Sequence, residues 1–389
     1  MNRFFMIAGE PSGDRLGGAL MQGLRNLEPE TLFDGVGGPE MKEQGLASRF
    51  DMSELSVMGL AEVLPKYRHL KRRIAQMAEA VLADPPAALI TIDSPDFCLR
   101  VAARVRAVNP GIRTIHYVAP SVWAWRPHRA EKMAGTIDHV LALLPFEPPY
   151  MREAGMTCDF VGHPIAAEPV ATAAEIARFR AANWITDDQP LLLVLPGSRK
   201  SEVERLAPTF GEALRPVLAE LPEARVVVPT TANIAEVVES LVEKWPGDPL
   251  VLDPRGKRPA DAAMEKRAAF RTAEVAIAAS GTVSLELASA GTPMVIAYDM
   301  NWVSRQIISR MLKIDTVTLV NLVSETRAVP EMLGADCKPA KIADALFNVL
   351  NYPEAQTDAM DLTMARLGRG GEPPGQRAAY SVLKALGQA

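Results

Sequence analysis

The stretch Leu191-Leu-Leu-Val-Leu-Pro-Gly-Ser-Arg199-Lys-Ser-Glu202 joins an apolar run, a Gly-Ser turn carrying an arginine, and the start of a helical pattern. It predicts a buried strand, a tight turn and a helix. Backbone N–H groups at the start of a helix attract anions, and Arg199 adds a full positive charge. The turn is therefore a candidate phosphate site. It lies at mid-chain, where a second Rossmann-like half would begin.

A second turn of the same kind follows about ninety residues later, in the segment Ala278-Ala-Ser280-Gly281-Thr282-Val-Ser-Leu-Glu286. The carboxyl ends of strands in an open parallel sheet share one edge, so we expect both turns to face one crevice. Ser280, Gly281 and Thr282 would supply further donors there. Two such turns favour a nucleotide diphosphate over a single anion.

Length and composition set the outer limits of the interpretation. A chain of 389 residues suggests about two domains, and 48% apolar with 23% charged residues is typical of globular proteins. The net charge of -5 argues against nucleic acid as the main partner. Three cysteines without close pairing or metal-ligand spacing favour a reducing cytoplasm. An apolar run of the ~20 residues that would span a bilayer is absent from the sequence.

Short β-rich runs alternate with helical patterns along the whole chain. The runs lie at residues 4–8, 88–92, 114–118, 140–143, 191–195, 225–228, 275–278 and 293–298. This alternation predicts an α/β fold of βαβ units, with two Rossmann-like domains facing across a cleft. We expect an N-terminal domain over residues 1–165, a C-terminal domain over 166–352, and C-terminal helices over 353–389 that pack back on the first domain. A G-x-G-x-x-G fingerprint and a P-loop are missing, which weakens a dehydrogenase or an NTP-hydrolase interpretation.

Asp93 is the candidate general base. It lies in Ile92-Asp-Ser-Pro-Asp-Phe97, directly after a predicted strand, where open α/β sheets place their ligands. An equally weighted alternative is that Asp93 or Ser94 caps the following helix, with Pro95 in its first turn. A metal site at Asp93 and Asp96 is weaker, because two carboxylates without further spaced ligands seldom specify one.

Other polar or aromatic positions also allow two interpretations. Glu10 and Ser12 follow the first strand and are expected to project into the cleft, unless they are turn and N-cap residues. Trp123 and Trp125 suit a sugar ring or fill a domain interface. Asn321 either holds a ligand through its amide or closes a turn.

Residues 57–82 carry an amphipathic pattern, with an apolar stripe on one side and Lys66, Arg68, Lys71, Arg72 and Arg73 on the other. Such a helix can lie at an anionic membrane surface, with Val57, Met58, Leu60 and Leu64 contacting acyl chains. An ordinary surface helix with its stripe on the core is the alternative, and exposure of the apolar residues at the start of this segment would exclude it.

Ten stretches, in order along nearly the whole chain, resemble lipid-A-disaccharide synthase. They are Gly9-Glu-Pro-Ser-Gly-Asp14, Ser56-Val-Met-Gly-Leu-Ala-Glu-Val63, Ile92-Asp-Ser-Pro-Asp-Phe97, His116-Tyr-Val-Ala-Pro-Ser-Val-Trp-Ala-Trp-Arg126, Leu144-Pro-Phe-Glu147, Val161-Gly-His163, Leu195-Pro-Gly-Ser-Arg199, Glu202-Val203, Ala279-Ser-Gly-Thr282 and Asn321-Leu322. Each stretch alone is weak evidence for the resemblance, whereas ten stretches in the same order are specific for this family.

The resemblance implies a GT-B glycosyltransferase that condenses UDP-2,3-diacylglucosamine with 2,3-diacylglucosamine 1-phosphate, inverting the anomeric carbon without a metal or another cofactor. It also implies a cytoplasmic protein bound peripherally to the inner face of the bacterial inner membrane. A homodimer remains open. A UDP-N-acetylglucosamine epimerase, a peptidoglycan-type glycosyltransferase and a non-catalytic nucleotide-sugar or lipid-binding protein are the alternatives.

The resemblance also implies functions for individual residues. Asp93 matches the proposed base, Arg199 and Asn321 match residues of the UDP site, and Glu286 matches an acidic residue suited to a ribose hydroxyl. Glu10 and Ser12 match the first loop of the cleft. The expected arrangement is therefore a carboxylate of the N-terminal domain facing a diphosphate held by the C-terminal domain.

Overall fold

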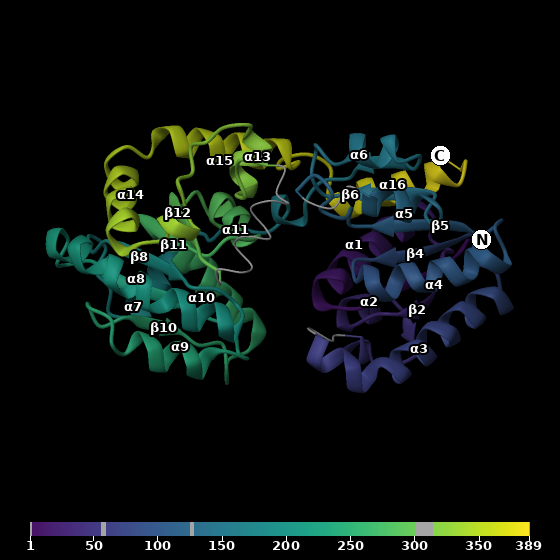
Figure 1. Cartoon of the computed structure of the whole chain (residues 1–389), viewed down its shortest axis with the longest axis horizontal. Coiled ribbons are helices and arrows are strands. Elements are labelled where there is room, and N and C mark those ends of the chain that lie inside the picture. The colour runs from purple at the N-terminus through teal and green to yellow at the C-terminus, as the bar shows by residue number, and fades with distance from the viewer. Residues whose placement is uncertain (1, 56–59, 125–127, 301–313, 389) are drawn as a thin grey trace. The chain divides into compact units, whose positions relative to one another are not determined.

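The computed structural model describes residues 2–55, 60–124, 128–300 and 314–388, with backbone alone for residues 60–66. Its contacts divide the chain into two compact units. Unit 1 comprises Met1–Ala167 and Leu367–Ala389, and unit 2 comprises Glu168–Arg366. In each unit helices cover both faces of one sheet (Figure 1), and every strand pair is parallel. The prediction of two doubly wound α/β halves is confirmed.

Unit 1 has a seven-stranded sheet in the order β3-β2-β1-β4-β5-β6-β7. Its strands are β1 (Arg3–Ala8), β2 (Leu32–Val36), β3 (Ala47–Ser48), β4 (Ala88–Ile92), β5 (Arg113–Tyr117), β6 (His139–Ala142) and β7 (Thr157–Phe160). Its helices are α1 (Pro11–Leu27), α2 (Pro39–Glu43), η1 (Met52–Glu54), α3 (Leu60–Ala83), α4 (Pro95–Val108), α5 (His128–Ala134), α6 (Pro148–Glu153), η2 (Pro164–Ala166) and α16 (Pro374–Ala385). The strand order reverses between β1 and β4.

Unit 2 repeats the design with six strands in the order β10-β9-β8-β11-β12-β13. Its strands are β8 (Leu191–Leu195), β9 (Arg225–Pro229), β10 (Leu250–Leu252), β11 (Val275–Ala278), β12 (Met294–Tyr298) and β13 (Glu331–Leu333). Its helices are α7 (Ala173–Ala182), α8 (Lys200–Glu220), α9 (Ala235–Val242), α10 (Pro259–Thr272), α11 (Val283–Ala290), α13 (Leu319–Ser324), η3 (Gly334–Asp336), α14 (Pro339–Asn351) and α15 (Glu354–Arg366). Here the order reverses between β8 and β11.

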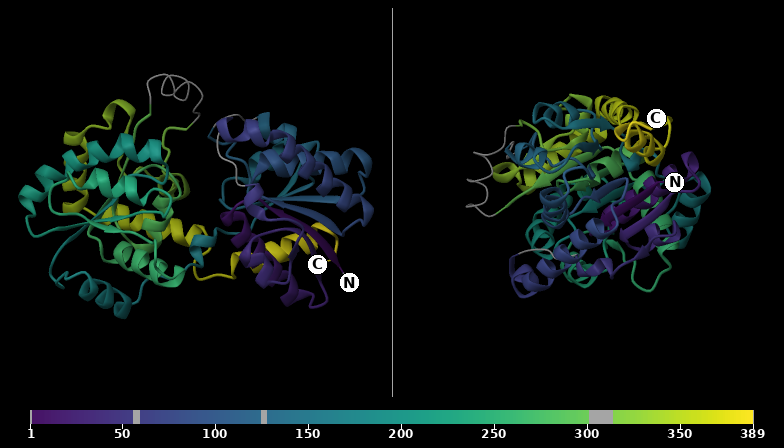
Figure 2. Two further views of the ribbon diagram at one scale, coloured as in Figure 1. Left: turned by 90° about the horizontal axis from the view of Figure 1, so that it is seen from below. Right: turned by 90° about the vertical axis from the view of Figure 1, so that its right-hand side faces the viewer.

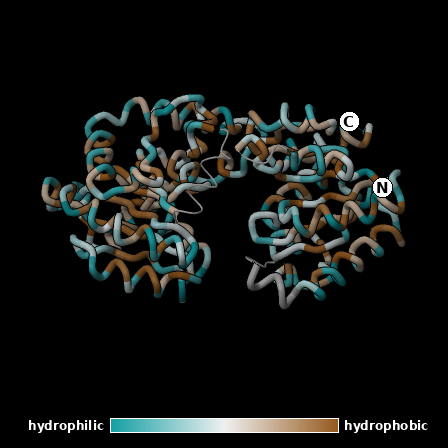
Figure 3. Tube along the Cα trace, in the orientation of Figure 1, coloured by the Kyte–Doolittle hydropathy of each residue, from teal (hydrophilic) through white to brown (hydrophobic). Residues whose placement is uncertain are grey.

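The central strands form the core of each unit because both of their faces are covered by helices. Residues 4–8 of β1 have no exposed surface, and all five residues of β8 are buried. Strands buried on both faces are continuously apolar instead of alternating, which explains the sequence pattern at both places. Figure 3 shows these hydrophobic stretches inside each unit.

The C-terminal helix α16 returns to unit 1 and packs on α1, beside the N-terminal segment (Figure 2). The two helices approach so closely that a Cβ on Gly23 would lie 2.5 Å from the Gly375 carbonyl oxygen. His139 on β6 adds a 2.7 Å hydrogen bond between its Nε2 and Ser381 Oγ. Glycines are therefore required at this crossing.

Helix α15 belongs to unit 2, whereas the sequence expectation grouped all of residues 353–389 with the first domain. Its Thr363 hydroxyl lies 3.2 Å from the Val320 carbonyl, and Arg366 Nη1 donates to the Val323 carbonyl at 2.6 Å. These contacts hold α15 against α13. Only residues 367–389 join unit 1.

Buried histidines make the stability of unit 1 sensitive to acid. Burial lowers the pKa of His116, His139 and His163 to about 4, from an ordinary 6.5. The unfolded chain therefore takes up protons first as the pH falls below 6.5, so the free energy of unfolding falls until about pH 4. One pKa unit is worth about 1.4 kcal/mol, so each histidine contributes about 3 kcal/mol at most, and urea titrations should show the free energy of unfolding falling across this window.

Glu147 opposes this trend. Burial raises its pKa to about 7, from 4.5, so its contribution to stability is complete at low pH and is lost as the pH rises from 4.5 to 7. The histidines outnumber it, so the net slope has their sign. His163→Gln should flatten the slope by about a third of the histidine effect, because glutamine can still accept from the Ile165 N–H. An unchanged slope in that variant would contradict this explanation.

Across the part of the chain that the structure describes, no helix is long and apolar enough to cross a membrane.

Candidate functional site

The reversal point of the unit 1 sheet brings two carboxyl side chains to one edge. Strands β1 and β4 pair in parallel up to Ala8 and Ile92. Glu10 follows β1 by two residues and Asp93 follows β4 directly. Both side chains are half-buried there. The strand pairing therefore places Glu10 and Asp93 at the same edge of the sheet.

The backbone at Asp93 is strained in a way that helix capping does not explain. Asp93 and Ser94 have φ values of 52° and 42°, in the left-handed region that residues other than glycine seldom adopt. Ser94 occupies the N-cap position of α4, but its side chain makes no capping hydrogen bond. Asp93 Oδ1 accepts from the adjacent Ser94 N–H, at 2.9 Å. Neither side chain caps α4, and strained backbone of this kind clusters at functional sites.

Glu10 lies beside this turn, next to Ser94. Its Oε1 is 3.5 Å from Ser94 Oγ. Burial, followed by the charge of Asp93 and a hydrogen bond to it, raises the pKa of Glu10. Gly9 permits the approach, since a Cβ there would lie 2.5 Å from Ser94 Oγ.

A cavity of about 250 Å³ opens beside Asp93 at the ends of β4 and β5. It is lined by Asp93, Pro95, His116, Val118, Ala119, Pro120, Ser121, Arg129 and Met133. Ser12, in the first turn of α1, is exposed and is not among these residues. His116 and Arg129, which the sequence did not mark as candidates, thus line the same cavity as Asp93.

The segment after β5 is anchored by a buried carboxyl group. Glu147 is 4% exposed and accepts from the Leu143 and Leu144 N–H groups at 3.1 and 3.0 Å. Its other oxygen lies 3.4 Å from Trp123 Nε1. Trp123 also packs edge-on against Phe146, with ring centroids 5.2 Å apart. Trp123 is therefore held by structural contacts, whereas Trp125 lies outside the described residues.

The phosphate-site turn of unit 2 has the predicted strand-turn-helix form. Gly197 has a φ of 124°, and a Cβ there would overlap the Glu202 carboxylate. Arg199 is exposed and occupies the N-cap position of α8 without a capping hydrogen bond from its side chain. Glu202 accepts from the Ser198 N–H at 3.0 Å. One of the backbone donors expected to be free is therefore already bonded, and an incoming anion would have to displace Glu202.

The second turn lies next to the first because β11 pairs with β8, with Ala278 opposite Leu195. Gly281 has a φ of 152°, Thr282 is exposed, and Ser280 is half-buried. The space around the Gly281 Cβ position is open to 4 Å. The two predicted turns thus share one edge of the sheet, at its reversal point.

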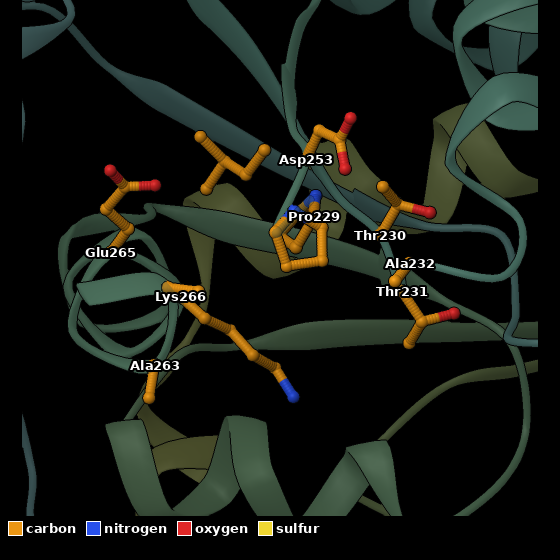
Figure 4. A pocket seen from close by; sticks show the side chains of 11 residues that line it. Pro229, Thr230, Thr231, Ala232, Asp253, Ala263, Glu265 and Lys266 are labelled. Atoms are coloured by element: carbon orange, nitrogen blue, oxygen red, sulfur yellow. The ribbon is translucent and has the colours of Figure 1, made fainter. Parts of the chain in front are cut away.

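A second cavity, of about 310 Å³, continues along the same sheet edge beyond β8. Thr230, Thr231 and Ala232 after β9 face Glu265 and Lys266 of α10 across it (Figure 4). Lys266 also forms an ion pair with Glu286 of α11. No sequence pattern marked this cavity, although the apolar run at residues 225–228 predicted one of the strands that end there.

Asn321 is buried and its amide is used within unit 2. Nδ2 donates to the Val329 carbonyl at 2.9 Å and to Thr316 Oγ1 at 3.1 Å, while Oδ1 accepts from the Val329 N–H at 2.9 Å. The structure therefore shows the turn-closing function. Ligand binding by Asn321 stays a prediction.

The structure does not describe the side chains of the candidate membrane residues. Val57 and Met58 lie outside the described residues, whereas Leu60 and Leu64 lie in α3 at positions where only the backbone is described. For metals, the described residues contain no group of three or more His, Cys, Asp or Glu side chains that could hold an ion.

Comparison with known proteins identifies the family. A sequence model described as lipid-A-disaccharide synthetase matches residues 4–372. The lipid-A-disaccharide synthase of Ruegeria pomeroyi is 65% identical over 99% of this chain and 95% of its own length. That of Rhodospirillum centenum is 47% identical over 98% of this chain and 94% of its own.

Solved structures support the fold at much lower identity. A UDP-GlcNAc 2-epimerase from Neisseria meningitidis bound to UDP-GlcNAc has a TM-score of 0.65 at 12% identity, covering 100% of both chains. An Anabaena protein in complex with UDP and glucose has a TM-score of 0.56 at 11% identity, with the same coverage. The fold is thus of the predicted GT-B type. The near-complete matches in sequence show that this chain belongs to the lipid-A-disaccharide synthase family, whose members are glycosyltransferases.

Proposed function

We propose that this chain transfers the 2,3-diacylglucosaminyl group of UDP-2,3-diacylglucosamine to the 6-hydroxyl of 2,3-diacylglucosamine 1-phosphate. The acceptor O6 forms a bond to the anomeric carbon as that carbon's bond to the diphosphate breaks. The hydroxyl proton passes to Asp93, and UDP departs with the bonding electron pair. One inverting displacement gives the β-1,6-linked disaccharide 1-phosphate. Family membership along the whole chain carries this proposal.

Unit 2 would hold the donor. The turns after β8 and β11 present backbone N–H groups and Arg199 at one sheet edge, where they would stabilise negative charge developing on the departing diphosphate. The cavity beside Lys266 would take the nucleoside, with Glu286 next to it for a ribose hydroxyl. Ser280, Gly281, Thr282 and Asn321 remain proposed contacts of the same ligand.

Unit 1 would supply the base. Asp93 lies directly before α4 but does not cap it, so capping does not explain its strained backbone. Asp93 also lines a cavity that can admit a sugar hydroxyl. Glu10 would share the proton that Asp93 receives, with exposed Ser12 at the entrance of this loop. The geometry of Asp93 relative to its cavity is the structural observation that most supports the assignment.

The direct test is the mass of the products. Incubation with both acylated glucosamines should release UDP and yield a disaccharide 1-phosphate whose mass equals the sum of the two lipids minus UDP. Omitting the acceptor should stop UDP release. Epimerisation of the donor, or binding of both lipids without UDP release, would refute the proposed reaction.

We further propose that residues 57–82 bind the cytoplasmic face of the inner membrane, with Val57, Met58, Leu60 and Leu64 against the acyl chains. Arg68, Lys71 and Arg72 of α3 are exposed, so they are free to face anionic headgroups. Each basic residue adds about 1 kcal/mol near such a surface.

Met58→Ser combined with Leu60→Ser should lower binding to anionic vesicles at least tenfold, because two apolar anchors are lost. Vesicle sedimentation at low and high salt measures this. Leu362→Ser is the matched control, since Leu362 is an exposed leucine of unit 2, 40% accessible. Vesicle binding that is unchanged in the double variant would contradict the membrane assignment.

A further inference from the structure

One stretch of chain makes up much of the cavity wall at Asp93. Nine residues of the described ranges line the cavity, and four of them, at positions 118–121, are consecutive. We call residues 118–121 the wall segment. The segment directly follows β5, so it connects the strand to the turn that ends at Ala124. A shift of the wall segment would therefore change the shape of the cavity next to Asp93.

The wall segment is fixed at its start by the neighbouring strand. The Val118 N–H donates to the Leu141 carbonyl of β6 at 3.0 Å. Val118 has a φ of 86° although it is β-branched, which is a costly conformation for such a residue. Strained backbone of this kind persists only where the surrounding structure enforces it. The chain therefore leaves the sheet in a direction that its contacts impose.

The end of the wall segment is fixed through a turn that contains Trp123. The Ala124 N–H donates to the carbonyl of Ser121, the last residue of the segment, at 3.2 Å. Val122 and Ala124 are buried on either side of Trp123, at 2% and 9% exposed. The indole Nε1 of Trp123 lies 3.4 Å from Glu147 Oε1. Because Trp123 and Ser121 share one turn, moving the indole would move the end of the wall segment.

Glu147 is a costly residue to place at the other side of this contact. Burial raises the pKa of its carboxyl group to about 7, from 4.5, although three N–H groups lie within hydrogen-bonding distance of it. Oε2 accepts from both Leu143 and Leu144, which leaves Oε1 for Trp123. An apolar side chain of the same volume would fill the space without this cost. A carboxyl group can also join the backbone after β6 to the indole, which an apolar side chain cannot do.

We propose that Glu147 is a positioning residue for the acceptor sugar: through Trp123 it holds the wall segment where the sugar must lie for its hydroxyl to reach Asp93. This inference rests on the proposed function, because it assumes that the acceptor enters this cavity. Glu147 and Trp123 are not among the residues that line the cavity, so they act through the wall segment. The proposed donor site belongs to unit 2, so Glu147 should leave donor binding unchanged.

Glu147→Gln removes the bond to Trp123 and can keep the other two. The glutamine oxygen can accept from Leu143 and Leu144, which places its NH₂ group against the Trp123 Nε1–H, so that two donors face each other. We expect the KM for the acceptor to rise about 3- to 10-fold, the value of one hydrogen bond. Both kcat and the dissociation constant of the donor should stay within about twofold of the wild type. Steady-state rates at saturating donor measure KM and kcat, and calorimetry measures donor binding.

Two further variants sharpen this test. Trp123→Phe removes the same bond from the other side and keeps an aromatic ring against Phe146. If both changes act through one bond, the double variant should have an acceptor KM no higher than that of Glu147→Gln, because the amide then faces no donor. Independent effects would multiply, and a multiplied KM would overturn the inference. Glu153→Gln is the matched control, because Glu153 is exposed at the end of α6 and does not line the cavity.

An unchanged acceptor KM in Glu147→Gln, a loss confined to kcat, or an equal rise in the donor dissociation constant would also overturn the inference. Hydrogen exchange followed by mass spectrometry gives a readout that does not depend on the reaction. Backbone amides of residues 118–124 should exchange at least about threefold faster in Glu147→Gln, with no change in residues 88–92 of β4. If the wild type forms no disaccharide but this difference is measured, the reaction is wrong and the link from Glu147 to the wall segment stands. If the disaccharide forms and neither exchange nor acceptor KM changes, the positioning function is wrong.

Discussion

Asp93→Asn is expected to lower kcat about 10²- to 10⁴-fold while leaving the affinity for the UDP-linked donor within about twofold of the wild type. The amide has the size of the carboxylate, and its oxygen can still accept from the Ser94 N–H, which lies 2.9 Å from Asp93 Oδ1 in the wild type. It cannot take a proton from the acceptor hydroxyl. The variant therefore keeps the turn and loses the base.

Single-turnover measurement of disaccharide formation, with both substrates saturating, isolates this step from binding. Donor affinity is measured separately by calorimetry. Asp96→Asn is the control, because Asp96 is an exposed carboxylate in the first turn of the same helix. Wild-type turnover in Asp93→Asn would remove Asp93 from the mechanism, and an equal loss in Asp96→Asn would point to a general effect on α4.

Local patterns predicted the framework of the site well. The apolar run at residues 191–195 became a fully buried strand, and the turn that follows it carries Arg199 as expected. Glu10 and Asp93 were each expected after a strand, and parallel strands end at one edge of a sheet, which is where both lie. These features depend on neighbouring residues or on the rule of strand order, so they can be inferred from sequence.

Contacts between distant residues were not accessible in the same way. The hydrogen bond from the Ser198 N–H to Glu202 depends on a side-chain rotamer. The 2.8 Å contact between His116 Nδ1 and Thr91 Oγ1 joins residues of two different strands. The cavity at Lys266 needs β10, a strand of three residues too short for a periodic signal. Nothing in the local sequence around Arg129 marks the cavity that it lines.

The motif containing Glu10 also holds Asp14, and the structure separates their functions. Asp14 is 2% exposed and accepts from three backbone N–H groups before and within α2: Gly38 at 2.7 Å, Glu40 at 2.9 Å and Met41 at 3.1 Å. The bonds from Gly38 and Met41 are buried, so these two donors would be left without a partner if the Asp14 carboxylate were removed. The sequence presents Asp14 as part of a catalytic-looking motif, whereas its contacts make it a structural anchor.

Asp14→Ala should therefore lower the free energy of unfolding by about 3 kcal/mol or more, because removing the acceptor leaves buried donors unsatisfied at about 1–3 kcal/mol each. The free energy of unfolding of Asp14→Asn should lie between those of Asp14→Ala and the wild type. The amide keeps one acceptor oxygen but points its NH₂ group toward a backbone donor. Urea titration measures both, with Asp96→Ala expected within about 0.5 kcal/mol of the wild type.

Activity separates the two interpretations of Asp14. The folded fraction of Asp14→Ala, measured well below its unfolding midpoint, should keep kcat within a few-fold of the wild type, because no atom of Asp14 lines the cavity at Asp93. Loss of turnover at undiminished stability would instead place Asp14 in the chemistry. The same motif would then supply two reacting carboxylates, and the assignment of Asp93 as the sole base would have to give way.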